Sequence, residues 1–198
     1  MSERKRAIDV GQGSKSTEHE LHGTEALFRA HAGFVASFLR RLGVASADVD
    51  DLTQEVFVVA HRKGGFIAGA GQPKSWLAAI AVRVASTYRR TLKRRREDAG
   101  AQPDVEPSSN VDPARALEAR RALQRVQQAL DSLALEERAT FVLFELEGWS
   151  CDAIAASFDI PVGTTYSRLH SARKRFAEAH ARLEREDSAV IRLRLAGT

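Results

Sequence analysis

Apolar residues recur at helical spacing from Thr24 to Leu42. Intervals of three and four place them on one face of a helix, and Gly43 ends the run. A second helix with the same spacing begins near Asp48, and its first turns are rich in acidic side chains. The helix dipole favours acidic residues there in any protein, but so many of them also make a surface for a basic or polar partner.

A third apolar run begins at Trp76 and changes character half-way along. Its first half carries apolar residues at helical spacing, whereas its second half carries Arg and Lys around Tyr88. A basic helix end with an aromatic residue suits a nucleic acid, although a solvated basic helix end has the same composition. The three helices together predict an N-terminal helical domain over residues 24–96.

The chain between the periodic segments is polar. Residues 97–113 contain three prolines and almost no large apolar side chain, which predicts a flexible linker. Residues 1–23 lack periodicity and are expected to be a disordered tail. Helical spacing resumes at 114 and predicts a second domain over residues 114–186, followed by a C-terminal tail at 187–198. The fold class expected is all-α, with two small helical domains joined by the linker.

Two short helices joined by a tight turn are predicted between Gly148 and Phe176, as a helix-turn-helix. Ser150 can cap the first helix, and Pro161 ends that pattern while being well suited to open the second helix. Asp159 lies in the turn and tolerates left-handed backbone better than most residues. The outer face of the second helix carries hydroxyl, imidazole and basic groups that suit base edges and phosphates in a major groove. A solvated basic face would show the same pattern.

The amino-acid composition excludes several kinds of site. The 198 residues carry a net charge of +4, too small by itself to indicate a nucleic-acid partner. Cys151 is the only cysteine, so an intrachain disulfide and a cysteine-rich zinc site are excluded. His19 and His22 lack the spacing of a metalloprotease motif, and neither a metal nor another cofactor is expected. No apolar stretch has the length of a membrane span, so we expect a cytoplasmic protein without membrane insertion.

Taken together and in order, these segments resemble the extracytoplasmic-function (ECF) sigma factors of bacterial RNA polymerase, in the sigma-70 family. The resemblance covers residues 24–96 and 115–180. It rests on DVDDLTQEVFVVAHR, then WLAAIAVRVASTYRRTLKRRR, then LDSLALEERATFVLFELEGWSCDAIAASFDIPVGTTYSRLHSARKRF. It implies that residues 24–96 are sigma domain 2 and residues 114–186 are sigma domain 4. The protein would then be no enzyme, but a factor that directs promoter-specific transcription initiation.

The resemblance also implies partners: core RNA polymerase, through the clamp helices of its largest subunit and its flap, promoter DNA, and an anti-sigma protein. Polymerase binding is expected at Asp51, Leu52, Gln54, Glu55 and Phe57. Recognition and opening of the minus-ten element are expected at Trp76, Arg83, Tyr88, Arg89 and Arg90. At the minus-thirty-five element, the base edges are expected to meet Tyr166, Ser167, His170 and Ser171, and the phosphates Thr164, Arg168, Arg173 and Lys174.

Two departures from the family pattern bear on which promoter is read. The third helix has Val82 and Arg83 after Ile-Ala, where the family usually has Arg and Asn, and Thr165 and Tyr166 replace the commoner Val and a basic residue. The alternative function is a stand-alone helix-turn-helix regulator that acts without polymerase. Such a regulator usually dimerises on a symmetric site, whereas two unlike DNA-facing domains predict an asymmetric bipartite site.

Overall fold

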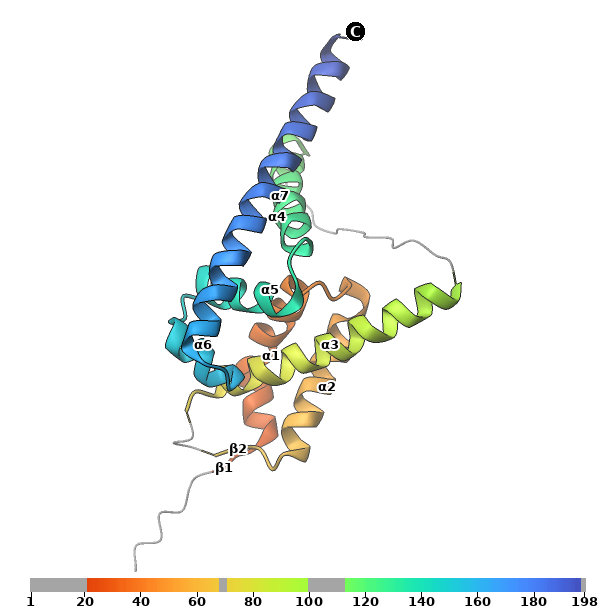
Figure 1. Cartoon of the computed structure of the whole chain (residues 1–198). Coiled ribbons are helices and arrows are strands. Elements are labelled where there is room, and N and C mark those ends of the chain that lie inside the picture. The colour runs from red at the N-terminus through yellow and green to blue at the C-terminus, as the bar shows by residue number, and fades with distance from the viewer. Residues whose placement is uncertain (1–20, 68–70, 100–112, 197–198) are drawn as a thin grey trace, which may run out of the picture.

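The computed structural model of the protein describes residues 21–67, 71–99 and 113–196 (Figure 1). These residues are almost wholly helical, which confirms the all-α class. Their one sheet is an antiparallel pair of two-residue strands, β1 (Leu21–His22) and β2 (Phe66–Ile67), with Leu21 opposite Ile67. The sheet ties the start of the first helix to the loop after the second.

We call residues 21–99 the N-terminal unit. It contains α1 (Thr24–Arg41), the 3₁₀ turn η1 (Ser46–Asp48), α2 (Val49–Arg62) and α3 (Pro73–Ala99). The three α-helices pack on one another, and each contributes apolar side chains at the spacing seen in the sequence. The fully buried ones include Val35, Phe38, Leu39, Val56, Leu77 and Ala81.

We call residues 113–196 the C-terminal unit. It contains α4 (Pro113–Asp131), α5 (Leu135–Phe141), the π-helical turn η2 (Val142–Leu146), α6 (Cys151–Phe158) and α7 (Val162–Ala196). Helices α4 and α7 lie side by side and antiparallel, and together they project beyond the rest of the molecule (Figure 1). Arg125 and Asp187 join them with an ion pair of 2.6 Å.

The helix-turn-helix prediction is confirmed in its local detail. The Ser150 hydroxyl oxygen accepts a hydrogen bond of 3.2 Å from the Ala153 amide and caps α6. Asp159 ends α6 in the left-handed region, with φ 53° and ψ 52°. The Pro161 carbonyl then accepts from the Thr164 amide at 2.9 Å, which starts the first turn of α7. A left-handed residue and a proline together fix the angle between the two helices.

The element boundaries differ from expectation at several places, and α3 and α4 extend into the expected linker, to Ala99 and from Pro113. Strand β1 lies inside the range expected to be a tail, and α3 begins at Pro73 instead of Trp76, because proline is well accommodated in a first helical turn. Helix α7 also differs, because it continues to Ala196 and includes most of the range expected to be a C-terminal tail. Six of the ten residues from 187 to 196 are the strong helix formers Ala, Leu and Arg, and no Gly or Pro interrupts the range before Gly197. Most of the expected linker lies outside the described residues.

The two units pack against each other. Helix α3 contacts α5 and α6, and the ring of Phe34 on α1 stacks on that of Trp149 just before α6, with centroids 6.2 Å apart. Buried apolar side chains of the two units consequently form one continuous cluster. The helical periodicity contained no indication of this contact, because it reports which face of a helix is buried and not which element covers it.

The left-handed backbone at Asp159 gives a prediction about stability. Glycine adopts this conformation without steric cost, whereas a side chain with a Cβ costs roughly 1 kcal/mol. We expect Asp159→Gly to be more stable than Asp159→Ala by about that amount in urea unfolding. Asp152, an exposed residue in the first turn of α6, is the matched control, because glycine there is less stable than alanine. The same order of stability at both positions would contradict the prediction.

Candidate functional site

The first candidate surface lies on α2. Asp51, Gln54 and Glu55 are exposed, as the expected polymerase-binding set requires. Leu52 is half-buried and Phe57 is buried, so these two side chains support the surface from beneath. The structure therefore divides the five expected residues into an outer polar set and an inner apolar set.

Sequence reasoning missed two apolar members of this surface. Val58 is 46% exposed and follows Asp51 by seven residues and Gln54 by four, so it shares their face of α2. Phe28 on α1 is 44% exposed, and its ring meets that of Phe57 edge-on, with centroids 4.9 Å apart. The spacing of Val58 from the acidic residues was the signal that could have identified it. Exposed apolar groups within a polar rim are typical of protein–protein interfaces.

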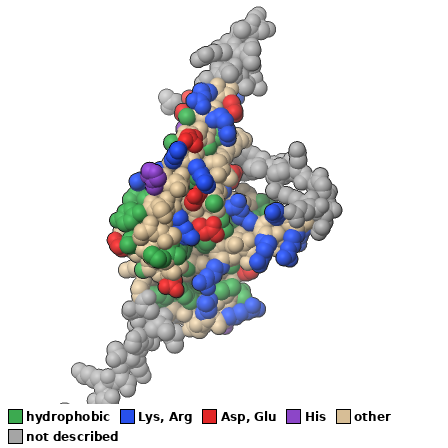
Figure 2. Space-filling view, viewed as in Figure 1, with side chains coloured by type: hydrophobic (Ala, Val, Ile, Leu, Met, Phe, Trp, Pro, Cys, Tyr) green, Lys and Arg blue, Asp and Glu red, His purple; other side chains and the backbone are tan. Residues whose placement is uncertain are grey.

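The second candidate surface is the basic part of α3. Figure 2 shows Lys and Arg side chains gathered on the projecting end of this helix. Arg83 and Arg90 are exposed and, being seven residues apart, share one helical face. These two residues of the expected minus-ten set point to solvent.

The other three residues of that set are partly buried. The Tyr88 hydroxyl donates a hydrogen bond of 2.6 Å to the carboxylate of Asp48 in η1, which ties α3 to the start of α2. The Trp76 ring packs against that of Phe66 in β2, with centroids 5.8 Å apart. Arg89 is half-buried, and its Nη1 has no hydrogen-bond partner among the described residues. The structure thus gives Tyr88 and Trp76 contacts of their own within the N-terminal unit.

The third candidate surface is the outer face of α7. Thr165, Leu169 and Ala172 are buried as their spacing predicts, and this sets which residues face outward. Tyr166 is 58% exposed, and Ser167, His170, Arg173 and Lys174 are also exposed, whereas Thr164, Arg168 and Ser171 are half-buried. The Ser167 hydroxyl donates to the Thr164 carbonyl at 3.0 Å, so it is partly committed to its own helix.

The basic side chains on α7 differ in whether they form ion pairs with carboxylates of the protein. Arg173 lies 2.6 Å from Glu145, and its guanidinium sits over the ring of Phe144 at 5.0 Å. Arg175, which lies outside the expected minus-thirty-five set, pairs with Glu137 at 2.8 Å. Arg168 pairs with no carboxylate of the described residues. Because ion pairs on a surface are weak, Arg173 remains available to a phosphate. For Arg168, no carboxylate in the described part of the chain competes with a phosphate.

The described residues hold no group of three or more His, Cys, Asp and Glu side chains that could bind a metal ion. Among the described helices, none combines the length and the apolar character needed to cross a membrane. Of the histidines, His31 has a pKa lowered by burial and by the nearby charge of Lys74.

The three candidate surfaces together define a class: a helical protein with a helix-turn-helix, a basic helix, and an acidic helix face that includes exposed apolar groups.

Comparison with known proteins agrees with this class. Residues 27–95 match the family model for sigma-70 region 2, and residues 123–176 match that for sigma-70 region 4. The ECF RNA polymerase sigma-E factor of Escherichia coli (strain K12) is 33% identical over 150 residues, which are 71% of this chain and 77% of that protein. The ECF RNA polymerase sigma factor SigE of Mycolicibacterium smegmatis is 32% identical over 155 residues, 78% of this chain but 60% of that protein. The chain belongs to the ECF sigma factors of the sigma-70 family.

Solved structures show the same fold. The sigma factor RpoE of Bartonella quintana, solved in complex with the anti-sigma factor NepR, matches with a TM-score of 0.63 and 22% identity, covering 78% of this chain and 94% of that one. CnrH, solved in complex with the cytosolic domain of CnrY, matches with a TM-score of 0.54 and 23% identity, covering 78% and 85%.

Arg168 gives a prediction about salt dependence, because no carboxylate within the described ranges pairs with it. If its guanidinium meets a phosphate, Arg168→Ala weakens promoter binding about equally on different sequences and lowers the slope of log K against log salt by roughly 0.9. The measurement is a salt titration of promoter-fragment binding by the protein together with core RNA polymerase. Arg182→Ala, further along the same helix and exposed, is the matched control and should leave the slope unchanged. An unchanged slope for Arg168→Ala would exclude the phosphate contact.

Proposed function

We propose that this protein binds core RNA polymerase and directs it to promoters by reading a minus-thirty-five element with α7 and a minus-ten element with α3. The observation that carries the proposal is the division of α7 into a buried stripe and an outer face. Thr165, Leu169 and Ala172 fix the helix on its own unit, so the side chains between them are presented together to a groove. Tyr166 and His170, both exposed and one turn apart, would meet base edges.

Polymerase binding is assigned to the face of α2 that carries Asp51, Gln54 and Glu55, joined by the exposed apolar groups of Val58 and Phe28. Carboxylates at such a rim steer a basic partner and fix its orientation, while the apolar groups supply the desolvated centre. We assign the clamp helices of the polymerase's largest subunit to this face. The polymerase flap would bind the C-terminal unit.

Promoter opening is assigned to α3 and the loop before it. Breaking the duplex costs about 1.4 kcal/mol per stacked step. An unstacked base held by protein offsets part of that cost, and the arginines on the exposed face of α3 would hold the adjoining backbone. Arg83 and Arg90 are both exposed and would make the backbone contact. No nucleotide hydrolysis is required, because capture of the open strand supplies the free energy.

A stand-alone regulator is less well supported. Such a protein needs a helix-turn-helix and a dimer contact, and it has no use for a region-2 unit with an acidic-apolar face. The matches to both sigma regions favour a polymerase-bound factor. The two solved relatives are complexes with NepR and with CnrY, and we propose that this protein is likewise held by an anti-sigma partner in the cytoplasm.

The α2 face gives a direct prediction. Glu55→Lys replaces a carboxylate with an ammonium at an exposed position, so it should weaken binding to core RNA polymerase by about tenfold or more without changing thermal unfolding. Affinity is measured by titrating labelled protein with core enzyme in the absence of DNA. Glu184→Lys makes the same charge change on an exposed part of α7 and serves as the control. If Glu55→Lys binds core RNA polymerase with wild-type affinity, the polymerase does not bind this face of α2.

The function itself is tested by mixing the purified protein with core RNA polymerase and a library of bacterial promoter fragments. We expect transcripts that begin at defined positions on a subset of fragments sharing two spaced elements. Core enzyme alone is the control and should give no such selection. If no transcript appears while the protein alone protects a symmetric DNA site, the stand-alone regulator is the correct function.

A further inference from the structure

Two exposed apolar side chains lie at the start of the recognition helix. Val162, the first residue of α7, is 40% exposed, and Tyr166, one turn later, is 58% exposed. Because they are four residues apart, they share one side of the helix. The buried side chains of Thr165 and Leu169 hold this end of α7 on its own unit, so the pair is presented to solvent in a fixed position. Val162 lies outside the set of residues expected at the minus-thirty-five element.

The protein itself does not cover this pair. Tyr166 makes neither a hydrogen bond nor a ring contact with another residue in the described part of the chain. Among the described side chains of α7, no other large apolar group is exposed. Removing apolar surface from water is favourable, so a ligand that covers both groups gains affinity from them. In a major groove, the apolar group that a base edge offers is the 5-methyl group of thymine.

Gly163 lies directly after Val162, and the protein does not explain its presence. A Cβ at this position would have no contact within 4 Å, and the backbone there is not left-handed. Glycine lowers the stability of a helix relative to alanine, so neither packing nor conformation favours it. Close approach of the backbone to a ligand is a further reason for glycine, because a Cβ would prevent that approach. The exposed first turn of α7 is where such a ligand would lie.

The polar groups on the same two turns are suited to A·T pairs. The Ser167 hydroxyl donates its proton to the Thr164 carbonyl, so it presents only acceptor lone pairs to a ligand. An acceptor can pair with the amino group of adenine or cytosine, whereas the major-groove edge of guanine offers acceptors only. Arg168 is the one Lys or Arg between 162 and 170, and it is half-buried. These turns therefore lack the exposed cation that most often reads guanine.

We propose that Val162 and Tyr166 read thymine 5-methyl groups in the minus-thirty-five element, and that Gly163 allows the first turn of α7 to lie against the base edges. The inference rests on the proposed function and deepens it by naming the chemical group that is read. Tyr166 replaces the basic residue that is commoner in the family, so an aromatic ring stands here in place of a cation. Val162 and Tyr166 thereby determine specificity, and Gly163 is a positioning residue.

Replacing thymine with deoxyuridine tests the methyl contact, since it removes that one group and keeps the base pair. Promoter fragments selected by the protein with core RNA polymerase are resynthesised with deoxyuridine at each thymine of the minus-thirty-five element, one at a time on either strand. We expect binding of the polymerase-bound protein to weaken by about fourfold at one or two positions, as for the loss of one buried carbon group. Thymines outside both promoter elements are the control and should not respond.

Alanine variants identify the side chains that make the contact. In Tyr166→Ala and in Val162→Ala, affinity for the thymine-containing promoter should fall, and uracil should cause no further loss at the position that the side chain contacts. Leu123→Ala is the matched control, because it removes a 70% exposed apolar side chain from α4 of the same unit. This control should keep the full uracil effect.

Gly163→Ala tests the close approach, with stability measured beside affinity. We expect promoter binding to weaken by about tenfold or more while the temperature of thermal unfolding does not fall, since alanine favours a helix and meets no atom of the protein here. Gly33→Ala is the matched control, because Gly33 is an exposed glycine on α1 whose Cβ would also have no contact. It should leave promoter binding unchanged. Wild-type promoter affinity in Gly163→Ala would overturn the close approach.

The outcomes separate this inference from the proposed function. If the protein with core enzyme initiates at defined promoters but no uracil substitution weakens binding, or the uracil effect persists in both Tyr166→Ala and Val162→Ala, the methyl reading is overturned and the function stands. Selected minus-thirty-five elements without an A·T pair would overturn it as well.

A different result would remove the function first. If core enzyme gives no selective transcription while the protein alone protects a DNA site, the proposed function fails. The methyl contact of α7 is then upheld if uracil weakens binding at that site and Tyr166→Ala removes the effect, and it is overturned if uracil has no effect. A protein that binds no DNA, with or without core enzyme, contradicts both.

Discussion

The position of α6 determines where both candidate DNA surfaces lie. This eight-residue helix packs on α7, where it sets the angle of the recognition helix, and on α3, where it brings the basic helix of the other unit close. A helix this short is not stable by itself, so its ends must be fixed by local chemistry and its faces by packing. Ser150 and Asp159 fix the two ends of α6. The buried side chains of Ile154 and Ala155 hold its faces against the neighbouring helices. The position of the two candidate DNA surfaces relative to α6 follows from those four residues.

On both α2 and α7, one row of side chains is buried against the protein and the remaining side chains are exposed to solvent. On α7 the outward residues are polar, basic and aromatic, which suits a wet, charged ligand such as duplex DNA. On α2 the outward face mixes carboxylates with Val58, and Phe28 from α1 extends it. Apolar groups would add little to a DNA contact, and carboxylates would oppose it. The two faces are therefore suited to different partners, although each lies on an ordinary amphipathic helix.

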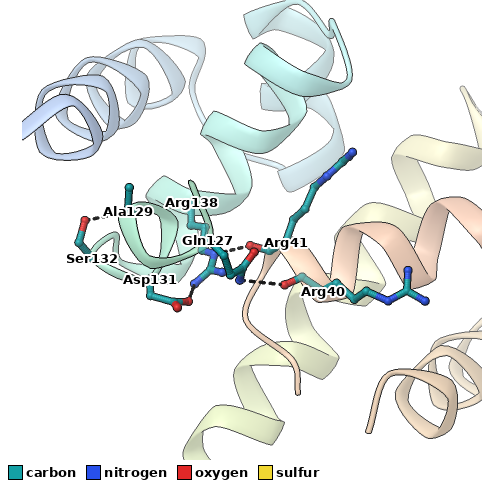
Figure 3. Close-up of polar contacts among 7 residues, drawn as sticks. All are labelled: Arg40, Arg41, Gln127, Ala129, Asp131, Ser132 and Arg138. Carbon is teal, nitrogen blue, oxygen red and sulfur yellow. Dashed lines mark hydrogen bonds and ion pairs between the residues drawn. The ribbon is translucent and has the colours of Figure 1, made fainter. Parts of the chain in front are cut away.

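Features that depend on near neighbours in the chain could be predicted, and contacts between distant segments could not. The buried stripe of Thr165, Leu169 and Ala172, the cap at Ser150 and the left-handed Asp159 all follow from spacing and residue type within a few positions. Arginine is typical of the surface, yet the side chain of Arg138 is buried where α5 meets the end of α4 and the end of α1 from the other unit (Figure 3). The stacking of Phe34 on Trp149 is non-local in the same way. The helical periodicity of the sequence placed these residues in or next to helices. It could not show which segment of the other unit each one contacts.

The use of arginine at position 138 bears on how firmly the units are joined. An apolar side chain of similar volume in a buried contact often stabilises a protein as much as an ion pair does, or more. Such a contact would have no directional requirement and no unpaired donor, so opening it would be opposed by the whole buried area. A guanidinium that depends on the main-chain oxygen of Arg41 and the half-exposed carboxylate of Asp131 holds a specific geometry instead, and it loses both bonds over a small displacement. The contact at Arg138 therefore constrains how the end of α1 lies against α4 and α5 more closely than an apolar contact would.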